Sequence, residues 1–307
     1  MTKGLVSVII PSYKGSDKVE KAVKSVLSQT YKDVEVIVVD DNGLGTDEQK
    51  KTEKVLTQFE KNSNFHYITH ETNKNGSAAR NTGAKNSNGE YLGFLDDDDE
   101  YLPNFVQLHI DAHRELDDEY ALTYCSCQQY RNGQKVETAR KTKSGRLFYE
   151  VMRHRVTVGS SSLLIKKSAY EKVNGFDESF RRHQDWEFTA RVAHRYKIKA
   201  VDHIGFIRYL EYRNSPKNYE TAKEYRVHYI EKMMPYIKSL NKKQQKDIIT
   251  SNYVGVMMQL LRTGKIRKFI QEYRSFKLGL YGIPFVVKSI FSYIFINKNF
   301  WTLRKRK

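Results

Sequence analysis

Apolar runs and amphipathic segments alternate through the first hundred residues of this 307-residue chain, and this order constrains the fold more than any other feature. Residues 5–10, 34–39, 65–68 and 91–95 are short apolar or β-branched runs typical of buried strands. Between them, residues 16–27, 47–61 and 78–86 are expected to be helices. The order β-α-β-α-β-α-β predicts an α/β fold in which helices cover both faces of a parallel sheet.

Four consecutive aspartates, at residues 96–99, follow the fourth apolar run. Four like charges at the end of a buried strand repel one another unless a cation or several hydrogen-bond donors lie among them. A carboxylate cluster there suits a hard divalent metal ion, and such an ion suits a bound diphosphate. The alternative is a solvated acidic loop that caps the next helix.

Polar side chains follow three of the expected strands. The first strand runs into Pro11-Ser12-Tyr13, the second into Asp40-Asp41-Asn42, and the fourth into the aspartates. The carboxyl ends of parallel strands share one rim of a sheet, and open α/β sheets bind ligands there. An aromatic face, a carboxylate pair and a metal-type cluster are together what recognition of a nucleotide-sugar requires.

The chain changes character after residue 100. Residues 103–116 and 184–194 are expected to be helical, 160–165 and 197–201 extended, and 120–130 with 135–139 a hairpin around Asn132-Gly133. Strand signals largely stop after Asn214-Ser215-Pro216. We therefore predict one domain over residues 1–215 and a helical C-terminal region over residues 216–307.

An ordered set of motifs lies within residues 5–215. The motifs are Val6-Ser7-Val8-Ile9-Ile10-Pro11-Ser12-Tyr13, Ser25-Val26-Leu27-Ser28-Gln29-Thr30-Tyr31, Val38-Val39-Asp40-Asp41-Asn42, Gly76-Ser77-Ala78-Ala79-Arg80-Asn81-Thr82-Gly83, Phe94-Leu95-Asp96-Asp97-Asp98-Asp99, Gly175-Phe176-Asp177-Glu178 and Gln184-Asp185-Trp186-Glu187. In this order they resemble family 2 glycosyltransferases of the GT-A fold, of the type that builds bacterial surface polysaccharides. The resemblance implies a Rossmann-like sheet that binds a nucleotide-sugar, with residues 1–100 as the nucleotide-binding half and 101–215 as the acceptor half.

The resemblance also implies a role for each matching residue on the nucleotide side. Tyr13 would lie against the uracil or another base, and Asp41 would accept the base N–H. Arg80 would reach the base or the phosphates, and Pro11 would line the pocket through its backbone. Asp97 would lie near the ribose.

On the catalytic side, Asp98 would coordinate Mn²⁺ or Mg²⁺ bridging the diphosphate, helped by Asp96. Asp185 matches the family's catalytic base, and Gln184 stands where an acidic residue is usual. The implied enzyme is a metal-dependent, inverting, hexosyltransferase-type glycosyltransferase. It would move a sugar from a nucleotide-sugar, expected to be UDP-linked, to a saccharide or lipid-linked saccharide acceptor.

Several of these residues also have a purely structural interpretation. Tyr13 can be a strand-end aromatic, Asp40 and Asp41 can begin a turn, Arg80 can be a surface charge, and Asp185 can cap a helix. Trp186 and Phe188 are expected to be packing residues. Cys125 and Cys127 alternate on one expected strand, so reduced packing cysteines are favoured over a disulfide, and a lone CxC is a weak metal signal.

The positive charge is concentrated in the C-terminal region. Residues 216–307 hold 20 Lys and Arg against 5 Asp and Glu, which is +15 of the net +17. An apolar stripe runs from Ile266 to Phe276, and a mostly apolar stretch, residues 283–296, precedes Trp301 and Arg304-Lys305-Arg306-Lys307. Because a spanning helix needs about 20 apolar residues, this stretch instead predicts that residues 266–307 lie on an anionic membrane surface.

The other interpretations of this region are packing on the catalytic domain, or on another copy in a homo-oligomer. No secretory signal is visible, and we expect a cytoplasmic enzyme peripheral to the inner face of the cell membrane. Two further functions are compatible with the sequence. The chain could be a basic-tailed nucleic-acid-binding protein, which an acidic rim disfavours, or a glycosyltransferase-like domain that binds a nucleotide without turnover.

Overall fold

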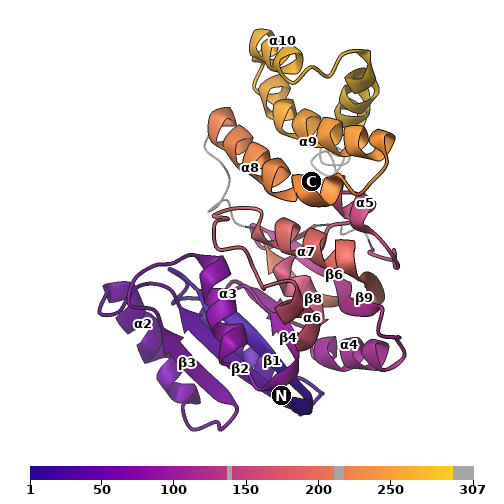
Figure 1. The fold of residues 1–307 in the computed structure, drawn as a ribbon. Helices are drawn as coiled ribbons and strands as arrows, with labels where there is room; N and C mark the ends of the chain where they lie inside the picture. Colours follow the sequence, from indigo (N-terminus) through magenta and orange to yellow (C-terminus); the bar gives the residue numbers. More distant parts are fainter. Residues whose placement is uncertain (137–139, 211–217, 293–307) are drawn as a thin grey trace. The chain divides into compact units, whose positions relative to one another are not determined.

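The chain divides into two compact units, Met1–Tyr212 and Arg213–Lys307 (Figure 1). The computed structural model describes residues 1–136, 140–210 and 218–292. The predicted boundary at residue 215 lies outside these described residues, as do Trp301 and the four basic residues 304–307. Each unit has a hydrophobic core of its own.

Four parallel strands form one half of the sheet of the first unit. They are β1 (Thr2–Ser12), β2 (Val34–Asp40), β3 (Phe65–Thr69) and β4 (Gly89–Phe94), in the spatial order β3-β2-β1-β4. Every residue of β2 is buried, as expected of a continuous β-branched run inside a parallel sheet. The predicted α/β fold and its parallel arrangement are confirmed for this half.

Helices cover both faces of these strands because side chains alternate along β1. Val6, Val8 and Ile10 belong to one hydrophobic cluster with α1 (Val19–Leu27), α2 (Asp47–Leu56) and α4 (Phe105–Arg114). Ile9 points to the opposite face, where α3 (Gly76–Lys85) lies. A Cβ at Gly83 would stand 2.4 Å from Ile9 Cγ2, so α3 approaches the sheet this closely only because Gly83 lacks a side chain.

The other half of the sheet is mixed. The order continues from β4 through β8 (Leu163–Lys166), β6 (Tyr120–Arg131) and β9 (Lys197–Tyr209) to β5 (Asp99–Tyr101). Strand β8 is antiparallel to both β4 and β6, whereas β6 and β9 are parallel. Strand β9 continues well past residue 201, where the sequence predicted its end. The prediction stopped there because irregularities in the pairing of β9 with β6 interrupt the two-residue alternation that marks a strand in sequence.

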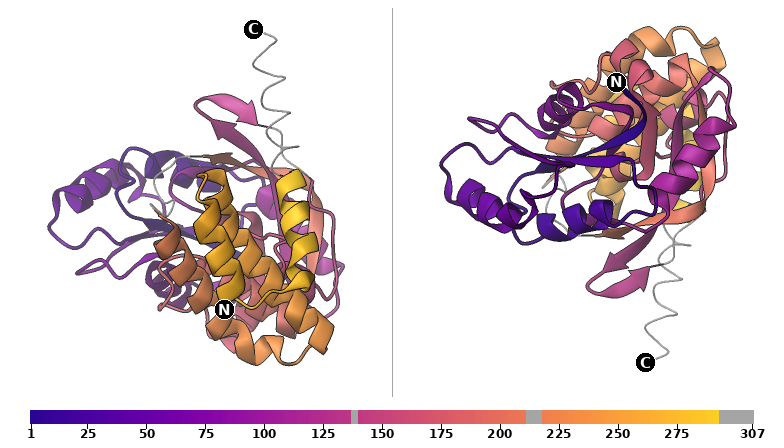
Figure 2. Two further views of the ribbon diagram at one scale, coloured as in Figure 1. Left: turned by 90° about the horizontal axis from the view of Figure 1, so that it is seen from above. Right: turned by 90° about the horizontal axis from the view of Figure 1, so that it is seen from below.

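The predicted hairpin turns at Asn132 and Gly133, both with positive φ, and joins β6 to β7 (Gln134–Val136). Figure 2 shows this hairpin extending beyond the body of the first unit. Three short or medium helices complete that unit: α5 (Phe148–Met152), α6 (Lys167–Lys172) and α7 (Gln184–Arg195).

Aromatic rings fix α7 to the sheet. Phe188 is fully buried, and its ring stacks on Phe176 at 4.2 Å, which in turn meets Phe94 of β4 edge-on at 5.1 Å. Trp186 lies against His183 and His154, with ring centroids 4.0 and 4.1 Å away. Both residues pack as predicted, so the start of α7 is held at a defined place beside the end of β4.

The second unit is helical in its described part. It contains α8 (Tyr219–Ile237), α9 (Lys242–Arg262), α10 (Ile266–Ser275) and a further helical stretch over residues 283–292. A capping box between Asn241 and Gln244 starts α9. None of the described helices is both long and apolar enough to cross a membrane.

The predicted apolar stripe of α10 divides between two environments. Phe269, Tyr273 and Phe276 pack against the core of the second unit, where Phe276 stacks on Tyr253 at 4.0 Å. Ile266 and Ile270 are exposed. The stripe is therefore partly a packing face within the second unit, which neither the membrane prediction nor its alternatives had named.

Candidate active site

The four aspartates form a buried to half-buried turn between β4 and β5. Asp96, Asp98 and Asp99 each place a carboxylate oxygen within 4.8 Å of the other two. Asp99 is 2% exposed and begins β5, where it pairs with Arg208 of β9 rather than capping a helix. The structure thus brings the predicted metal ligands Asp96 and Asp98 together and adds Asp99, and the tract is not a freely solvated loop.

Arg80 links the aspartates to the start of α7. Its Nη2 donates to Asp96 Oδ1 at 2.6 Å, and its Nη1 donates to Gln184 Oε1 at 2.9 Å. Burial alone would raise the pKa of Asp96, but the Arg80 guanidinium, with Arg208 and Ser160, holds that pKa below its usual range. Arg80 is 8% exposed, so it is a buried bridge and not a solvated surface charge.

Asp97 turns away from its neighbours and holds the loop after β1. Its Oδ2 accepts bonds from Ser12 Oγ at 3.0 Å and from the backbone N–H of Tyr13 at 3.2 Å. A Cβ at Gly15 would stand 2.0 Å from this oxygen. Position 15 must therefore be glycine for the carboxylate to lie here.

Burial and the crowding of negative charge raise the pKa values of two aspartates in this turn. Burial, followed by the charge of Asp98, raises the pKa of Asp97 to about 7. Burial and the charges of Asp96 and Asp98 raise the pKa of Asp99 well above its usual range. A group of carboxylates whose ionisation is opposed in this way favours a bound cation.

Asp41 is 2% exposed, and its carboxylate organises the loop before α3. Oδ1 accepts from His70 Nδ1 and the Lys74 N–H, and Oδ2 accepts from Asn73 Nδ2 and the Asn75 N–H, all at 2.7–2.9 Å. These four bonds fill the carboxylate's usual acceptor positions. A base N–H would have to displace one of them, and the base-binding role of Asp41 stays a prediction.

The remaining nucleotide-side residues lie at the carboxyl end of β1. Pro11 pairs with Val39 of β2 and is partly buried. Tyr13 is 50% exposed, with Lys14 Nζ 5.2 Å from its ring centroid. The ring is exposed, and its role in stacking on a base stays a prediction.

Asp185 lies in the first turn of α7, with His183 at the N-cap position in a left-handed conformation. Asp185 is therefore not the helix cap. Burial and the charge of Asp96 raise its pKa, while Arg80 and Arg208 act in the opposite direction. The predicted base thus shares one electrostatic environment with the predicted metal ligands.

Sequence reasoning missed two residues of this environment. Arg208 lies beyond the predicted end of its strand, and although burial would lower its pKa, Asp99, Asp96 and Asp185 together raise it. Ser160 Oγ donates to Asp96 Oδ1 at 3.0 Å. The β5–β9 pairing that brings Arg208 here joins segments a hundred residues apart, and no local pattern indicates it.

Comparison with known families gives a clear match. The sequence model described as glycosyl transferase family 2 matches residues 7–173, more than half of the chain. An uncharacterized glycosyltransferase of Rickettsia typhi is 32% identical over 189 residues, which cover 60% of this chain and 57% of that protein.

Two further relatives have more informative names. The amylovoran biosynthesis glycosyltransferase AmsB of Erwinia amylovora is 27% identical over 193 residues, covering 60% of this chain and 62% of that protein. The putative teichuronic acid biosynthesis glycosyltransferase TuaG of Bacillus subtilis is 35% identical over 122 residues, covering 39% and 46%. The chain spans less than two thirds of the length of each of these three relatives.

Among solved structures, S. aureus TarS 1-349 in complex with UDP-GlcNAc is similar, with a TM-score of 0.58. The two chains are 16% identical, and the match covers 90% of this chain and 92% of that one. The likeness shows the fold, and it confirms the GT-A architecture predicted from the sequence motifs.

Proposed function

Because the chain belongs to glycosyltransferase family 2, we propose that its first unit transfers a sugar from a nucleotide-sugar to a hydroxyl group of a saccharide or lipid-linked saccharide. One observation carries this proposal. Three clustered carboxylates, the Asp185 carboxylate and the exposed Tyr13 ring gather around the carboxyl ends of β1 and β4. UDP is the proposed nucleotide, since the similar TarS structure is a UDP-GlcNAc complex.

The donor set fits a hard divalent cation. Asp96, Asp98 and Asp99 offer only carboxylate oxygens, which Mg²⁺ and Mn²⁺ prefer. Arg80 and Arg208 offset only part of the negative charge of residues 96–99. Asp98 and Asp96 would hold the ion, and when bound it offsets the negative charge that develops on the diphosphate leaving group.

Asp185 is the proposed general base. As the acceptor oxygen forms a bond to the anomeric carbon, the bond from that carbon to the diphosphate breaks, the sugar's configuration inverts, and the hydroxyl proton passes to Asp185. Its raised pKa makes the carboxylate a better proton acceptor. Positioned base catalysis of this kind contributes roughly 10²–10⁴-fold.

Calorimetry with UDP, first in EDTA and then in Mn²⁺, tests the donor and metal assignments. We expect binding in Mn²⁺ and little in EDTA, and Asp98→Ala should lose the metal-dependent part. Asp118→Asn removes a fully exposed carboxylate and is the matched control. Equal affinity with and without metal would contradict the metal assignment.

A panel of nucleotide-sugars tests turnover and identifies the donor. Asp185→Asn should retain UDP binding and lose transfer by roughly 10²-fold or more, because an amide cannot accept the proton. Transfer by this variant within a few-fold of wild type would exclude Asp185 as the base. A wild-type protein that binds UDP but turns over no sugar would instead be the binding-only domain.

We further propose that the second unit holds the enzyme at an anionic membrane surface on the cytoplasmic side, near a lipid-linked acceptor. In the helical stretch 283–292, Phe285, Val286 and Ile290 pack on the unit's core, whereas Ile283, Val287 and Phe291 are 44–68% exposed at spacings of four. An apolar row with Lys288 beside it, in a strongly basic region, suits an anionic lipid surface.

Flotation with anionic vesicles tests this second proposal. Replacing Ile283, Val287 and Phe291 together by serine should release the protein from the vesicles without removing a core contact. Leu108→Ser, at an exposed apolar position of α4 in the first unit, is the control and should float like the wild type. Full-length protein that never floats would contradict the membrane proposal, and a loss of dimer in the triple variant would assign the row to a second copy.

A further inference from the structure

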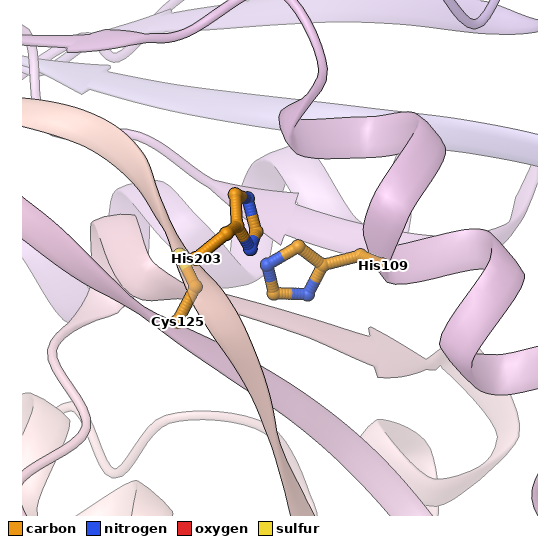
Figure 3. A group of neighbouring side chains, drawn as sticks. All are labelled: His109, Cys125 and His203. Atoms are coloured by element: carbon orange, nitrogen blue, oxygen red, sulfur yellow. The ribbon is translucent and has the colours of Figure 1, made fainter. Parts of the chain in front are cut away.

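Two histidines and a cysteine that the proposed reaction does not use meet in the interior of the first unit (Figure 3). His109 lies on α4, Cys125 on β6 and His203 on β9. Each offers one ligand atom, and these atoms lie within 4.8 Å of one another. His109 and Cys125 are completely buried.

His109 is oriented toward the other two side chains by a hydrogen bond on its far side. Its Nδ1 lies 2.7 Å from Thr123 Oγ1, and that hydroxyl donates to the carbonyl oxygen of Leu164. When the hydroxyl donates to Leu164 O, 3.4 Å away, His109 Nδ1–H is the donor to Thr123 and Nε2 carries the lone pair that a metal ion would take. Nε2 is buried and has no hydrogen-bond partner. This second contact is what fixes the tautomer of metal-binding histidines.

Two irregularities in the β6–β9 pairing place His203 beside Cys125. Tyr124 pairs with Ala200 and Ser126 with Ile204, so Cys125 alone faces residues 201–203. The next step, from Ser126 to Cys127, skips Gly205. Bulges of this kind re-aim side chains, and they cost ladder hydrogen bonds. His203 Nε2 is also buried without a partner.

The backbone at position 205 leaves room for these ligand atoms. A Cβ at Gly205 would stand 2.6 Å from Cys125 Sγ and 2.8 Å from His203 Nε2. Any other residue at this position would therefore collide with both side chains. The absence of a side chain is required at the place where the thiol and the imidazole meet.

We propose that His109 Nε2, Cys125 Sγ and His203 bind a borderline-soft transition-metal ion of the Zn²⁺ type. Two imidazoles and a thiolate are ligands that select zinc over magnesium or calcium. Around such an ion the ligand atoms would lie roughly 3.3–3.6 Å apart, so atoms that now lie within 4.8 Å of one another would move together by at most about 1.5 Å. Among the described residues no fourth side chain joins the group, as in zinc sites that keep one position for water.

The Cys125 thiol is unreactive in the metal-free protein. Burial raises the pKa of Cys125 to about 12, while Lys141 and the Gly205 N–H act to lower it. In the metal-free protein the thiol is therefore protonated and a poor nucleophile. Binding forms the sulfur–metal bond as the S–H proton leaves for solvent.

A metal ion here would tie together α4, β6 and β9. Strand β9 carries Arg208 to the aspartate turn, so the ion would hold the part of the sheet that supplies this arginine. The proposed metal is separate from the Mn²⁺ or Mg²⁺ of the candidate active site, and the proposal does not depend on glycosyl transfer.

Cobalt titration of the full-length, chelator-treated protein tests the proposal, because Co²⁺ replaces Zn²⁺ and only a thiolate ligand gives a sulfur-to-cobalt charge-transfer band. We expect that band at one Co²⁺ per chain, its displacement by Zn²⁺, and a higher melting temperature with Zn²⁺. Cys125→Ala and His109→Gln should abolish the band. Cys127→Ala on the same strand and His113→Gln on the same helix are matched controls that should retain it.

His203→Gln gives an independent variant if Cys125→Ala fails to fold. Cobalt held at the aspartate turn produces no sulfur band, so the two sites are distinguished by the spectrum. Wild-type protein without the band would overturn the proposal. So would a band that survives in Cys125→Ala and disappears in Cys127→Ala.

Discussion

Single residues set the shape of the candidate active site, either by leaving space for a neighbouring side chain or by filling the hydrogen-bond acceptor positions of a carboxylate. Asp97 reaches Ser12 and Tyr13 only across the space that Gly15 leaves open. The Asp41 carboxylate accepts four hydrogen bonds from residues of the loop before α3. These carboxylates therefore build the loops on which a nucleotide would lie, in addition to any contact they make with it.

Gly15→Ala is expected to weaken UDP binding in Mn²⁺ by at least tenfold, which corresponds to about 1.4 kcal/mol. The new Cβ would displace the Asp97 carboxylate, and the Tyr13 loop would lose its two anchoring bonds. Calorimetry measures the loss. Gly255→Ala, where the Cβ meets only Arg226 Nη1 at 3.7 Å, should bind UDP like the wild type. Unchanged affinity in Gly15→Ala would show that the Asp97 contacts do not position the loop.

At the scale of elements, α4 connects the two halves of the first unit and carries two buried histidines one turn apart. His113 is 3% exposed, donates from Nε2 to the Leu164 carbonyl at 3.3 Å, and lies against Tyr91. Burial, assisted by the charge of Lys166, lowers its pKa to about 4. A helix that holds a neutral histidine in the core makes the fold sensitive to acid.

The free energy of unfolding should fall as the pH drops from about 6.5 toward about 4, since only the unfolded chain takes up a proton at His113 over this interval. The His113 contribution is fully present above about pH 6.5, and one proton corresponds to about 1.4 kcal/mol per pH unit. Urea unfolding at several pH values measures the slope.

His113→Gln keeps a donor for the Leu164 carbonyl but does not titrate, so its slope should be shallower than that of the wild type by about one proton. His109 has a lowered pKa as well, and the largest cause of that shift, burial, is the same in both proteins. Parallel pH profiles for the variant and the wild type would mean that His113 is not the titrating group.

At the scale of the whole molecule, the two units differ in charge and in composition. The first unit holds every residue of the candidate active site up to Arg208, and residues 216–307 carry +15 of the net +17. Each unit has its own hydrophobic cluster. Recognition of the donor and attachment to a surface can therefore be tested separately.

A protein that ends after Tyr212 should unfold cooperatively and bind UDP in Mn²⁺ within a few-fold of the full chain. The reason is that its core and its carboxylate cluster lie wholly in the first unit. Thermal unfolding and calorimetry give the two readouts, with the full-length protein as reference. Aggregation or loss of UDP binding would show that the second unit is needed for the fold of the first.

Local sequence patterns were sufficient to predict the parallel half of the sheet and the residues at its rim. Runs such as residues 34–39 and the aspartates after β4 are local signals, and parallel pairing places the ends of their strands at one edge. The motif order was enough to predict the family and the GT-A fold, which the comparisons confirmed.

The contacts that those side chains make depend on how distant segments pack together. The bridge from Asp96 through Arg80 to Gln184, the approach of Arg208, and the meeting of His109, Cys125 and His203 all join distant segments. The part of β9 beyond residue 201 escaped prediction because its bulges break the two-residue period, and the same bulges aim His203 at Cys125. A local pattern predicts an element, whereas contacts between elements follow from packing and pairing that the pattern does not contain.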